Sequence, residues 1–156
     1  MCKLERAGIV TKTSDNQSWE NTTAGNANAS AGPKSPRTSA EKQLKGLLHR
    51  AAAVNGNAQY AYIVKRISIF GSYLSDQERL SDVDVVIELQ PRHTDPTLQA
   101  QLFEAVNRRI PPTGSVFDDI YRAEREVWKV LKARSRTIQI ANSLPEGAAH
   151  RVVFEA

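Results

Sequence analysis

Apolar positions in the middle of the chain first follow the spacing of a helix. Between residues 38 and 56 they recur every three or four positions, which places them on one face of an α-helix. They are Leu44, Leu47, Leu48, Ala51 and Val54. Thr38 and Glu41 have the spacing of a capping box, and Asn55-Gly56 supplies a stop signal. The pattern predicts a first helix of about 16 residues that begins at Thr38.

Two strands are predicted next, because both the spacing and the residue types change. Residues 60–70 are rich in β-branched and aromatic side chains, and Gly71-Ser72 ends that stretch. A polar connector, residues 73–81, leads to a second predicted strand at residues 82–89.

Two further helices are predicted after these strands. Asp95 has the place of an N-cap with Pro96 at the first helical position, and this helix closes before Pro111-Pro112. The other helix is predicted over residues 117–133. Its predicted buried stripe consists of Ile120, Ala123, Val127, Val130 and Leu131.

Residues 137–141 and 150–154 are predicted as short final strands. The order of elements is then helix, two strands, two helices and one or two strands. We therefore predict an α/β fold of the α+β kind, a small mixed sheet flanked by helices over residues 38–156. A length of 156 residues with 40% hydrophobic residues suits one such domain and a tail.

Residues 1–37 differ in composition from the rest of the chain. Asn, Ser, Thr, Ala and Gly dominate residues 14–32, and the apolar residues among them show no period. Such a segment buries too little surface to offset the entropy of ordering, so a disordered low-complexity tail is predicted. Trp19 is either a docking anchor or an incidental tail residue. Removal of residues 1–37 is expected to leave the melting temperature nearly unchanged.

Composition favours a cytoplasmic protein without a membrane span. No apolar run approaches the roughly 18–20 residues that a span needs, and the first residues lack the apolar stretch of a secretory signal. Cys2 is the only cysteine, which excludes an intramolecular disulfide and fits a reducing compartment. The net charge of +4 suits either a nucleic acid or a polyanionic nucleotide. Because only 6% of the residues are aromatic, few platforms exist for stacking on bases, and nucleic acid is the less favoured partner.

The candidate chemistry lies around the two consecutive strands. Gly71-Ser72 follows the first strand, and glycine allows the sharp turn after which free amides and a hydroxyl can cradle a phosphate. In the second strand, Asp82 and Asp84 project from the same face, roughly 7 Å apart. Such carboxylates repel each other unless a cation lies between them, and oxygen ligands suit Mg²⁺ or Mn²⁺. The alternative is a solvent-facing strand whose acidic residues happen to alternate, although Asp is disfavoured in strands.

This arrangement resembles the signature of a known family. Phe70-Gly71-Ser72 followed by Asp82-Val83-Asp84-Val85 is similar to the motif of the polymerase β-like nucleotidyltransferases. The nearest resemblance is to minimal stand-alone prokaryotic members, some of which are antitoxin partners of helical toxins with the HEPN fold. It covers residues 65–89 by motif and residues 40–141 by the order of elements.

The resemblance implies an activity and a role for each residue of the motif. The activity is a Mg²⁺- or Mn²⁺-dependent transfer of a nucleoside monophosphate from an NTP, ATP by preference, to a hydroxyl of a protein, a nucleic acid or a small molecule. Gly71 and Ser72 would bind the triphosphate. Asp82 and Asp84 would be the catalytic metal ligands.

The sequence departs from the family pattern in two places. Active members supply a third carboxylate from a neighbouring strand, and residues 137–141 contain no acid. Glu88 lies about 13 Å along the strand from Asp84, which is too far for the two carboxylates to share an ion. Asp118 and Asp119 fall at a predicted helix start, where acids are common for capping and dipole reasons alone. Many small members also have an Arg and a Gly directly after the Gly-Ser, whereas this chain has Tyr73-Leu74-Ser75-Asp76. Arg79 either reaches a phosphate from the connector or is an ordinary exposed loop arginine.

Other reactive residues form no recognisable site. His49, His93 and His150 have no metal-ligand spacing, and Trp128 fits packing or partner contact. Two main functions therefore compete: an active nucleotidyltransferase, and a catalytically degenerate module of the same fold that acts as an antitoxin-like partner of a helical toxin. A nucleic-acid-binding domain without nucleotide chemistry is a third, weaker hypothesis.

Overall fold

A computed structural model describes residues 10–12, 19–21 and 33–156. It divides the chain into two units, Met1–Lys34 and Ser35–Ala156. In the first unit, β1 (Val10–Lys12) pairs antiparallel with β2 (Trp19–Asn21), so that Lys12 lies opposite Trp19. The predicted tail therefore contains one short strand pair, and the remainder of residues 1–32 lies outside the described residues.

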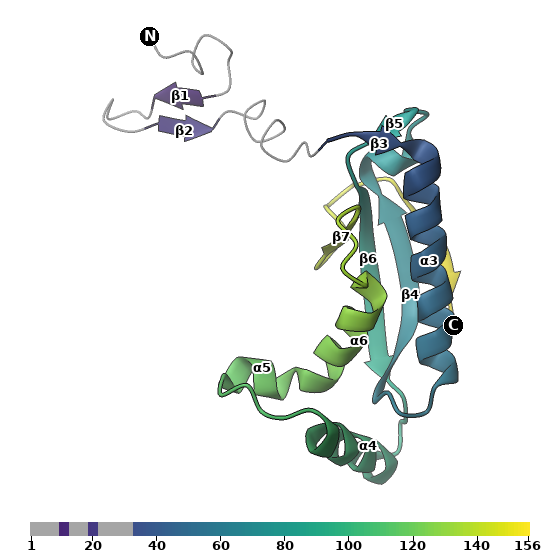
Figure 1. Ribbon diagram of the computed structural model, residues 1–156, viewed down its shortest axis with the longest axis vertical. Helices are drawn as coiled ribbons and strands as arrows, with labels where there is room; N and C mark the ends of the chain where they lie inside the picture. The colour runs from purple at the N-terminus through teal and green to yellow at the C-terminus, as the bar shows by residue number, and fades with distance from the viewer. Residues whose placement is uncertain (1–9, 13–18, 22–32) are drawn as a thin grey trace. The chain divides into compact units, whose positions relative to one another are not determined.

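The second unit is built on a four-stranded mixed sheet in the order β7-β6-β4-β8 (Figure 1). The central strand β4 (Tyr62–Phe70) is antiparallel to both β6 (Val83–Pro91) and β8 (His150–Glu155). The edge strand β7 (Ile138–Ala141) runs parallel to β6. The predicted α+β class with a mixed sheet is confirmed, and all four predicted strand regions take part in it.

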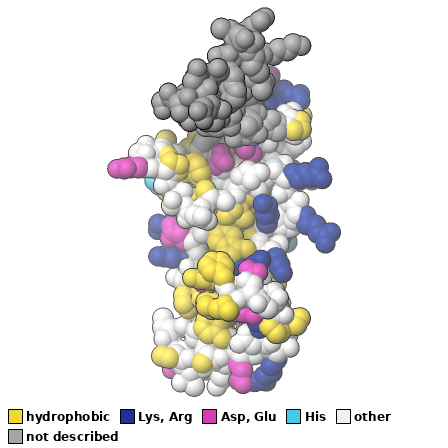
Figure 2. Space-filling model, turned by 90° about the vertical axis from the view of Figure 1, so that its left-hand side faces the viewer, with side chains coloured by type: hydrophobic (Ala, Val, Ile, Leu, Met, Phe, Trp, Pro, Cys, Tyr) yellow, Lys and Arg dark blue, Asp and Glu magenta, His cyan; other side chains and the backbone are white. Residues whose placement is uncertain are grey.

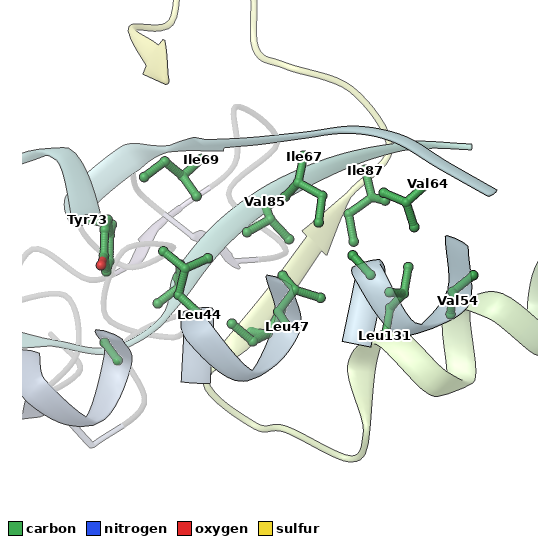
Figure 3. Close-up of a cluster of buried hydrophobic side chains, with 14 of the residues drawn as sticks. Leu44, Leu47, Val54, Val64, Ile67, Ile69, Tyr73, Val85, Ile87 and Leu131 are labelled. Carbon is green, nitrogen blue, oxygen red and sulfur yellow. The ribbon is translucent and has the colours of Figure 1, made fainter. Parts of the chain in front are cut away.

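Two helices pack against one face of this sheet and against each other (Figures 1 and 3). They are α3 (Arg37–Gly56) and α6 (Arg122–Lys132). The helical spacing read from the sequence brings one apolar stripe of α3 onto the strands, where burial of each large side chain contributes about 1.5–3 kcal/mol. Fully buried residues at this contact include Leu47, Val54, Val64, Ile67, Ile69, Val85, Val127 and Leu131.

The folded unit begins before the predicted boundary at residue 38. Strand β3 (Ser35–Pro36) pairs with β5 (Arg79–Leu80), and Arg37 is the first residue of α3. The predicted capping box is absent, because Pro36 holds the N-cap position without a side-chain hydrogen bond. Glu41 instead forms an ion pair with Arg37 at 3.4 Å. Residues 35–37, predicted as tail, belong to the domain.

Helix α4 (Pro96–Arg109) has the start that the sequence predicts. The Asp95 carboxylate accepts hydrogen bonds from the amides of Thr97 at 2.8 Å and Leu98 at 3.0 Å, and Pro96 opens the helix. The helix buries Val106 in a small cluster with Ala61 and Ala123. None of the helices in the described part of the chain is long and apolar enough to span a membrane.

The single helix predicted over residues 117–133 is wrong, because the chain breaks it at Tyr121. The short helix α5 (Val116–Ile120) ends there, and α6 starts at the next residue. Tyr121 has φ −92° and ψ 16°, outside the helical region, so α5 points away from the axis of α6 (Figure 1). The predicted burial of Ala123, Val127 and Leu131 is confirmed, whereas Ile120 is exposed.

Candidate functional site

The Gly-Ser turn has the geometry that its sequence predicts. Strand β4 ends at Phe70, and the backbone enters a 3₁₀ helix, η1 (Gly71–Leu74), with Gly71 at φ +71°. This left-handed conformation favours glycine. The carbonyl of Ser72 accepts hydrogen bonds from the amide of Ser75 at 3.1 Å and from its hydroxyl at 2.6 Å. The hydroxyl of Ser72 itself has no hydrogen-bond partner among the described residues.

Asp84 lies directly against this turn. The pairing of β4 with β6 places Phe70 opposite Asp84, one residue before Gly71. A β-carbon added to Gly71 would lie 2.7 Å from Asp84 Oδ2, a distance that side-chain carbons do not tolerate. Glycine is therefore favoured at this position by the turn, and a larger residue would also force the end of the Asp84 side chain to shift.

Asp82 and Asp84 form an electrostatically coupled pair at the start of β6. Val83 and Val85 are fully buried in the core, and the intervening Asp84 is partly buried. Burial raises the pKa of Asp84 above its ordinary value, and the negative charge of Asp82 raises it further. The Ser81 hydroxyl donates a hydrogen bond of 3.1 Å to Asp82 Oδ1. The structure thus brings Gly71, Asp82 and Asp84 to one end of the sheet.

Arg37 fixes the connector that joins the turn to the aspartates. Its guanidinium donates hydrogen bonds to the carbonyls of Ser75 at 2.7 Å and Tyr73 at 2.9 Å, and it stacks 5.0 Å from the centre of the Tyr73 ring. The amide of Arg37 donates to the carbonyl of Glu78 at 2.8 Å. Sequence reasoning missed this residue because no local pattern connects it to a connector 36 or more positions away.

The strand register adds two residues to the neighbourhood of Asp84. Gln139 of β7 is in register with Asp84, Asp84 with Phe70, and Phe70 with His150 of β8. Residues in register on adjacent strands share a face of the sheet, so these four form a row across it. Gln139 and His150 are both exposed. No local pattern indicates that His150 joins this row, since it lies 80 positions after Phe70, its partner in the register.

The other carboxylates weighed as a third metal ligand have partners elsewhere. Glu88 forms ion pairs with Arg66 at 3.7 Å and with Lys65 at 4.0 Å. Asp118 and Asp119 lie in α5. Among residues 10–12, 19–21 and 33–156, no group of three or more His, Cys, Asp and Glu side chains is placed to share a metal ion.

The remaining candidates lie on other elements than the aspartate pair. Arg79 is in β5, opposite Pro36. His49 is on the exposed side of α3. His93 lies in the loop before α4, where its amide donates to Gln99.

The aspartate pair fits a hard divalent cation that also binds a ligand. Magnesium is usually held by one or two carboxylates together with phosphate oxygens of the substrate. Two neighbouring carboxylates, one partly buried with a raised pKa, gain stability from such a charge between them. Gly71 leaves the space beside Asp84 free of side-chain carbon. The donor set therefore suits Mg²⁺ or Mn²⁺ rather than zinc, which prefers nitrogen and sulfur ligands.

Comparisons of the chain with protein-family models, with curated proteins and with solved structures found no significant match.

Proposed function

We propose that this protein is a Mg²⁺-dependent nucleotidyltransferase that moves a nucleoside monophosphate from an NTP to a hydroxyl acceptor. The observation that carries the proposal is the contact between Gly71 and the Asp84 carboxylate. It joins a sharp glycine turn suited to phosphate and a carboxylate pair suited to a divalent cation within one small space. The expected donor is ATP, and Mn²⁺ can replace Mg²⁺.

Each residue of the site has a role in this reaction. Asp82 and Asp84 would hold Mg²⁺, which supplies charge neutralisation to the triphosphate and to the leaving group. The amides of Gly71 and Ser72 and the Ser72 hydroxyl would donate hydrogen bonds to the terminal phosphates. The acceptor oxygen forms a bond to the α-phosphorus and loses its proton to solvent water, while the bond from that phosphorus to the bridging oxygen breaks and releases pyrophosphate. Positioning of the reactants by these residues provides most of the rate enhancement.

A second function is favoured by one observation, the position of Gln139. Gln139 is in register with Asp84 on the neighbouring strand, where a carboxylate would stand closest to the aspartate pair. An amide there provides one neutral oxygen in place of a charged ligand. The alternative is thus a catalytically degenerate module that retains nucleotide and acts as an antitoxin-like partner of a helical toxin.

The proposal is tested by transfer of label from α-labelled ATP, GTP, CTP or UTP, with cell lysate as the source of acceptors. The wild type is compared with Asp82→Asn and Asp84→Asn, each in Mg²⁺, in Mn²⁺ and in EDTA. Asp76→Asn is the matched control, because Asp76 is an exposed carboxylate of the same connector outside the pair. The enzymatic function is supported if the wild type and Asp76→Asn show metal-dependent labelling of an acceptor while Asp82→Asn and Asp84→Asn show none.

The variant Gln139→Glu separates the two functions. If the wild type binds nucleotide without transferring label and Gln139→Glu does transfer label, the protein is the catalytically degenerate module. If both aspartate variants label acceptors as well as the wild type does, the site assignment is wrong.

A further inference from the structure

Helix α5 has its polar and apolar sides reversed relative to an ordinary surface helix. It buries none of its residues. Its large apolar side chains face solvent, with exposed fractions of 77% for Val116, 68% for Phe117 and 70% for Ile120. Tyr121, directly after the helix, is 41% exposed, and its ring lies 4.7 Å from that of Phe117.

The carboxylates of α5 hold it in this orientation. Asp119 accepts hydrogen bonds from the amide of Thr113 at 2.9 Å and from the guanidinium of Arg122 at 2.8 Å. These two contacts also lower the pKa of Asp119, the amide of Thr113 being the larger cause. Asp118 pairs with Arg125. Polar contacts therefore attach α5 to the domain, while its apolar side remains available.

The apolar side chains of α5 continue onto α6. Phe117, Tyr121 and Trp128 together line a hollow of about 550 Å³. We call the group formed by Val116, Phe117, Ile120, Tyr121 and Trp128 the α5–α6 surface. Figure 2 shows hydrophobic side chains gathered over the middle of the face that carries these two helices. Contiguous exposed apolar groups of this kind mark interaction sites, because their exposure to water is unfavourable.

The side chains beside this surface that form no ion pair carry a positive charge in sum, because two lysines stand against one carboxylate. Among the nearby acids, Asp118 pairs with Arg125 and Asp119 with Arg122, whereas Glu124, which also lines the hollow, forms no ion pair within the described residues and hydrogen-bonds to the Tyr62 side chain. Lys129 lines a second hollow of about 250 Å³ on the other side of Arg125. Lys132 is one helical turn beyond Trp128, on the same side of α6. Neither lysine forms an ion pair within the described part of the chain.

These features together select one class of occupant. A second copy of the chain would bring the same unpaired lysines toward each other in a protein of net charge +4, which opposes self-association. A membrane would gain little from Arg122 and Arg125, which are neutralised, and it would not fill the two hollows. A protein segment can insert side chains into both hollows and place carboxylates next to the lysines.

We propose that the α5–α6 surface is a docking site for an acidic, amphipathic protein segment. The apolar side chains of the segment cover Phe117, Ile120 and Trp128, and its Asp or Glu residues face Lys129 and Lys132. This inference does not depend on chemistry at Asp82 and Asp84.

The probe for the test is a phage-displayed library of random 16-residue peptides, selected on the immobilised full-length chain. Enriched peptides are synthesised with a fluorophore and titrated by anisotropy against the wild type and against the double variant Phe117→Ser/Ile120→Ser. Leu98→Ser is the matched control, since Leu98 is a 46% exposed apolar residue of α4 outside the surface. Thermal melts followed by circular dichroism verify that each variant is folded.

The expected result is a set of peptides rich in Asp and Glu with apolar residues at helical spacing. Their binding weakens by roughly tenfold or more in Phe117→Ser/Ile120→Ser and stays unchanged in Leu98→Ser. The charge reversal Lys129→Glu/Lys132→Glu, which leaves the apolar residues in place, also weakens binding. Peptides whose acids are replaced by lysine then recover affinity for that variant.

Several results would overturn the inference. One is that no peptides bind the wild type more strongly than they bind Phe117→Ser/Ile120→Ser. Another is that the affinity of the selected peptides is the same for Lys129→Glu/Lys132→Glu as for the wild type. A dimer in sedimentation velocity that is lost in Phe117→Ser/Ile120→Ser would assign the surface to a second copy. Cosedimentation with phosphatidylserine vesicles that is lost in the same variant would assign it to a lipid surface.

Discussion

Gly71 and Asp84 touch across two paired strands, with Asp84 Oδ2 at 2.7 Å from the point where a β-carbon of residue 71 would stand. A side chain added to the turn at residue 71 would therefore displace the carboxylate of Asp84. The proposed phosphate-binding turn and one proposed metal ligand therefore lie in direct proximity.

Gly71→Ala is expected to destabilise the domain more than the same substitution at another glycine with a positive φ. Gly147 is the matched control, because it has φ +70° against +71° for Gly71 and nothing within 4 Å of its added β-carbon. Gly147→Ala should cost only the backbone strain, about 1–2 kcal/mol. Gly71→Ala should cost about 1 kcal/mol or more in addition, because Asp84 must move. Urea denaturation of both variants measures the difference.

A double-mutant cycle isolates the contact itself. In the background of Asp84→Ala the clashing oxygen is absent, so the cost of Gly71→Ala should fall to that of Gly147→Ala. If Gly71→Ala lowers the free energy of unfolding by the same amount in the Asp84→Ala background as in the wild type, the Asp84 carboxylate is not the cause of the extra destabilisation.

Asp84→Asn is expected to stabilise the folded domain at neutral pH in EDTA. The folded state raises the pKa of Asp84, so the ionised carboxylate is less favourable there than in the unfolded chain. The folded state of the wild type then binds more protons than the unfolded state between the ordinary Asp pKa of 3.8 and the raised folded value. Wild-type stability falls as pH rises through this window, and Asn removes that loss.

The measurement is chemical denaturation of both proteins at neutral pH and at pH values down toward the ordinary Asp pKa. The advantage of Asp84→Asn should shrink on acidification. Saturating Mg²⁺ should raise the melting temperature of the wild type only, because a cation that binds the folded state stabilises it. A variant less stable than the wild type at neutral pH in EDTA would refute the electrostatic account of the pair.

The strand–turn–strand region was predictable because its signals are local. Side-chain alternation and glycine geometry, which depend on neighbours in the sequence, shape residues 60–70, Gly71-Ser72 and the segment that starts at Asp82. The same holds for the Asp95 N-cap of α4. The predicted α+β class follows from the order of these elements.

Residues that gain their role from tertiary contacts were not predictable. Gln139 lies beside Asp84 only through the parallel register of β7 with β6. The break at Tyr121 interrupts a continuous helical pattern, and the Asp118 and Asp119 ion pairs join α5 to α6 across it. Composition places Arg37 in the tail, because composition carries no information about its hydrogen bond to the carbonyl of Ser75, 38 positions away.

Arg37→Ala is expected to lower the free energy of unfolding by about 1–3 kcal/mol, because charged hydrogen bonds to two carbonyls of the connector are lost. Arg37→Lys should recover only part of this, since an ammonium lacks the fork that reaches both carbonyls. Chains that start at Ser35 and at Thr38 provide an independent comparison. The first should melt close to the full chain and the second clearly below it. Equal melting temperatures for the two truncated chains would show that the folded domain begins at residue 38, as composition predicts.

The central claim is that Gly71, Ser72, Asp82 and Asp84 form one site for a metal-bound triphosphate, and calorimetric titration of ATP into the full-length protein tests it most directly. Wild type, Asp84→Asn, Gly71→Ala and the control Gly147→Ala are each titrated with Mg²⁺ and with EDTA. We expect binding by the wild type and Gly147→Ala that is strong only with Mg²⁺, and a loss of roughly tenfold or more in the other two variants. Binding that is independent of Mg²⁺, or that is equal in all four proteins, would contradict the claim.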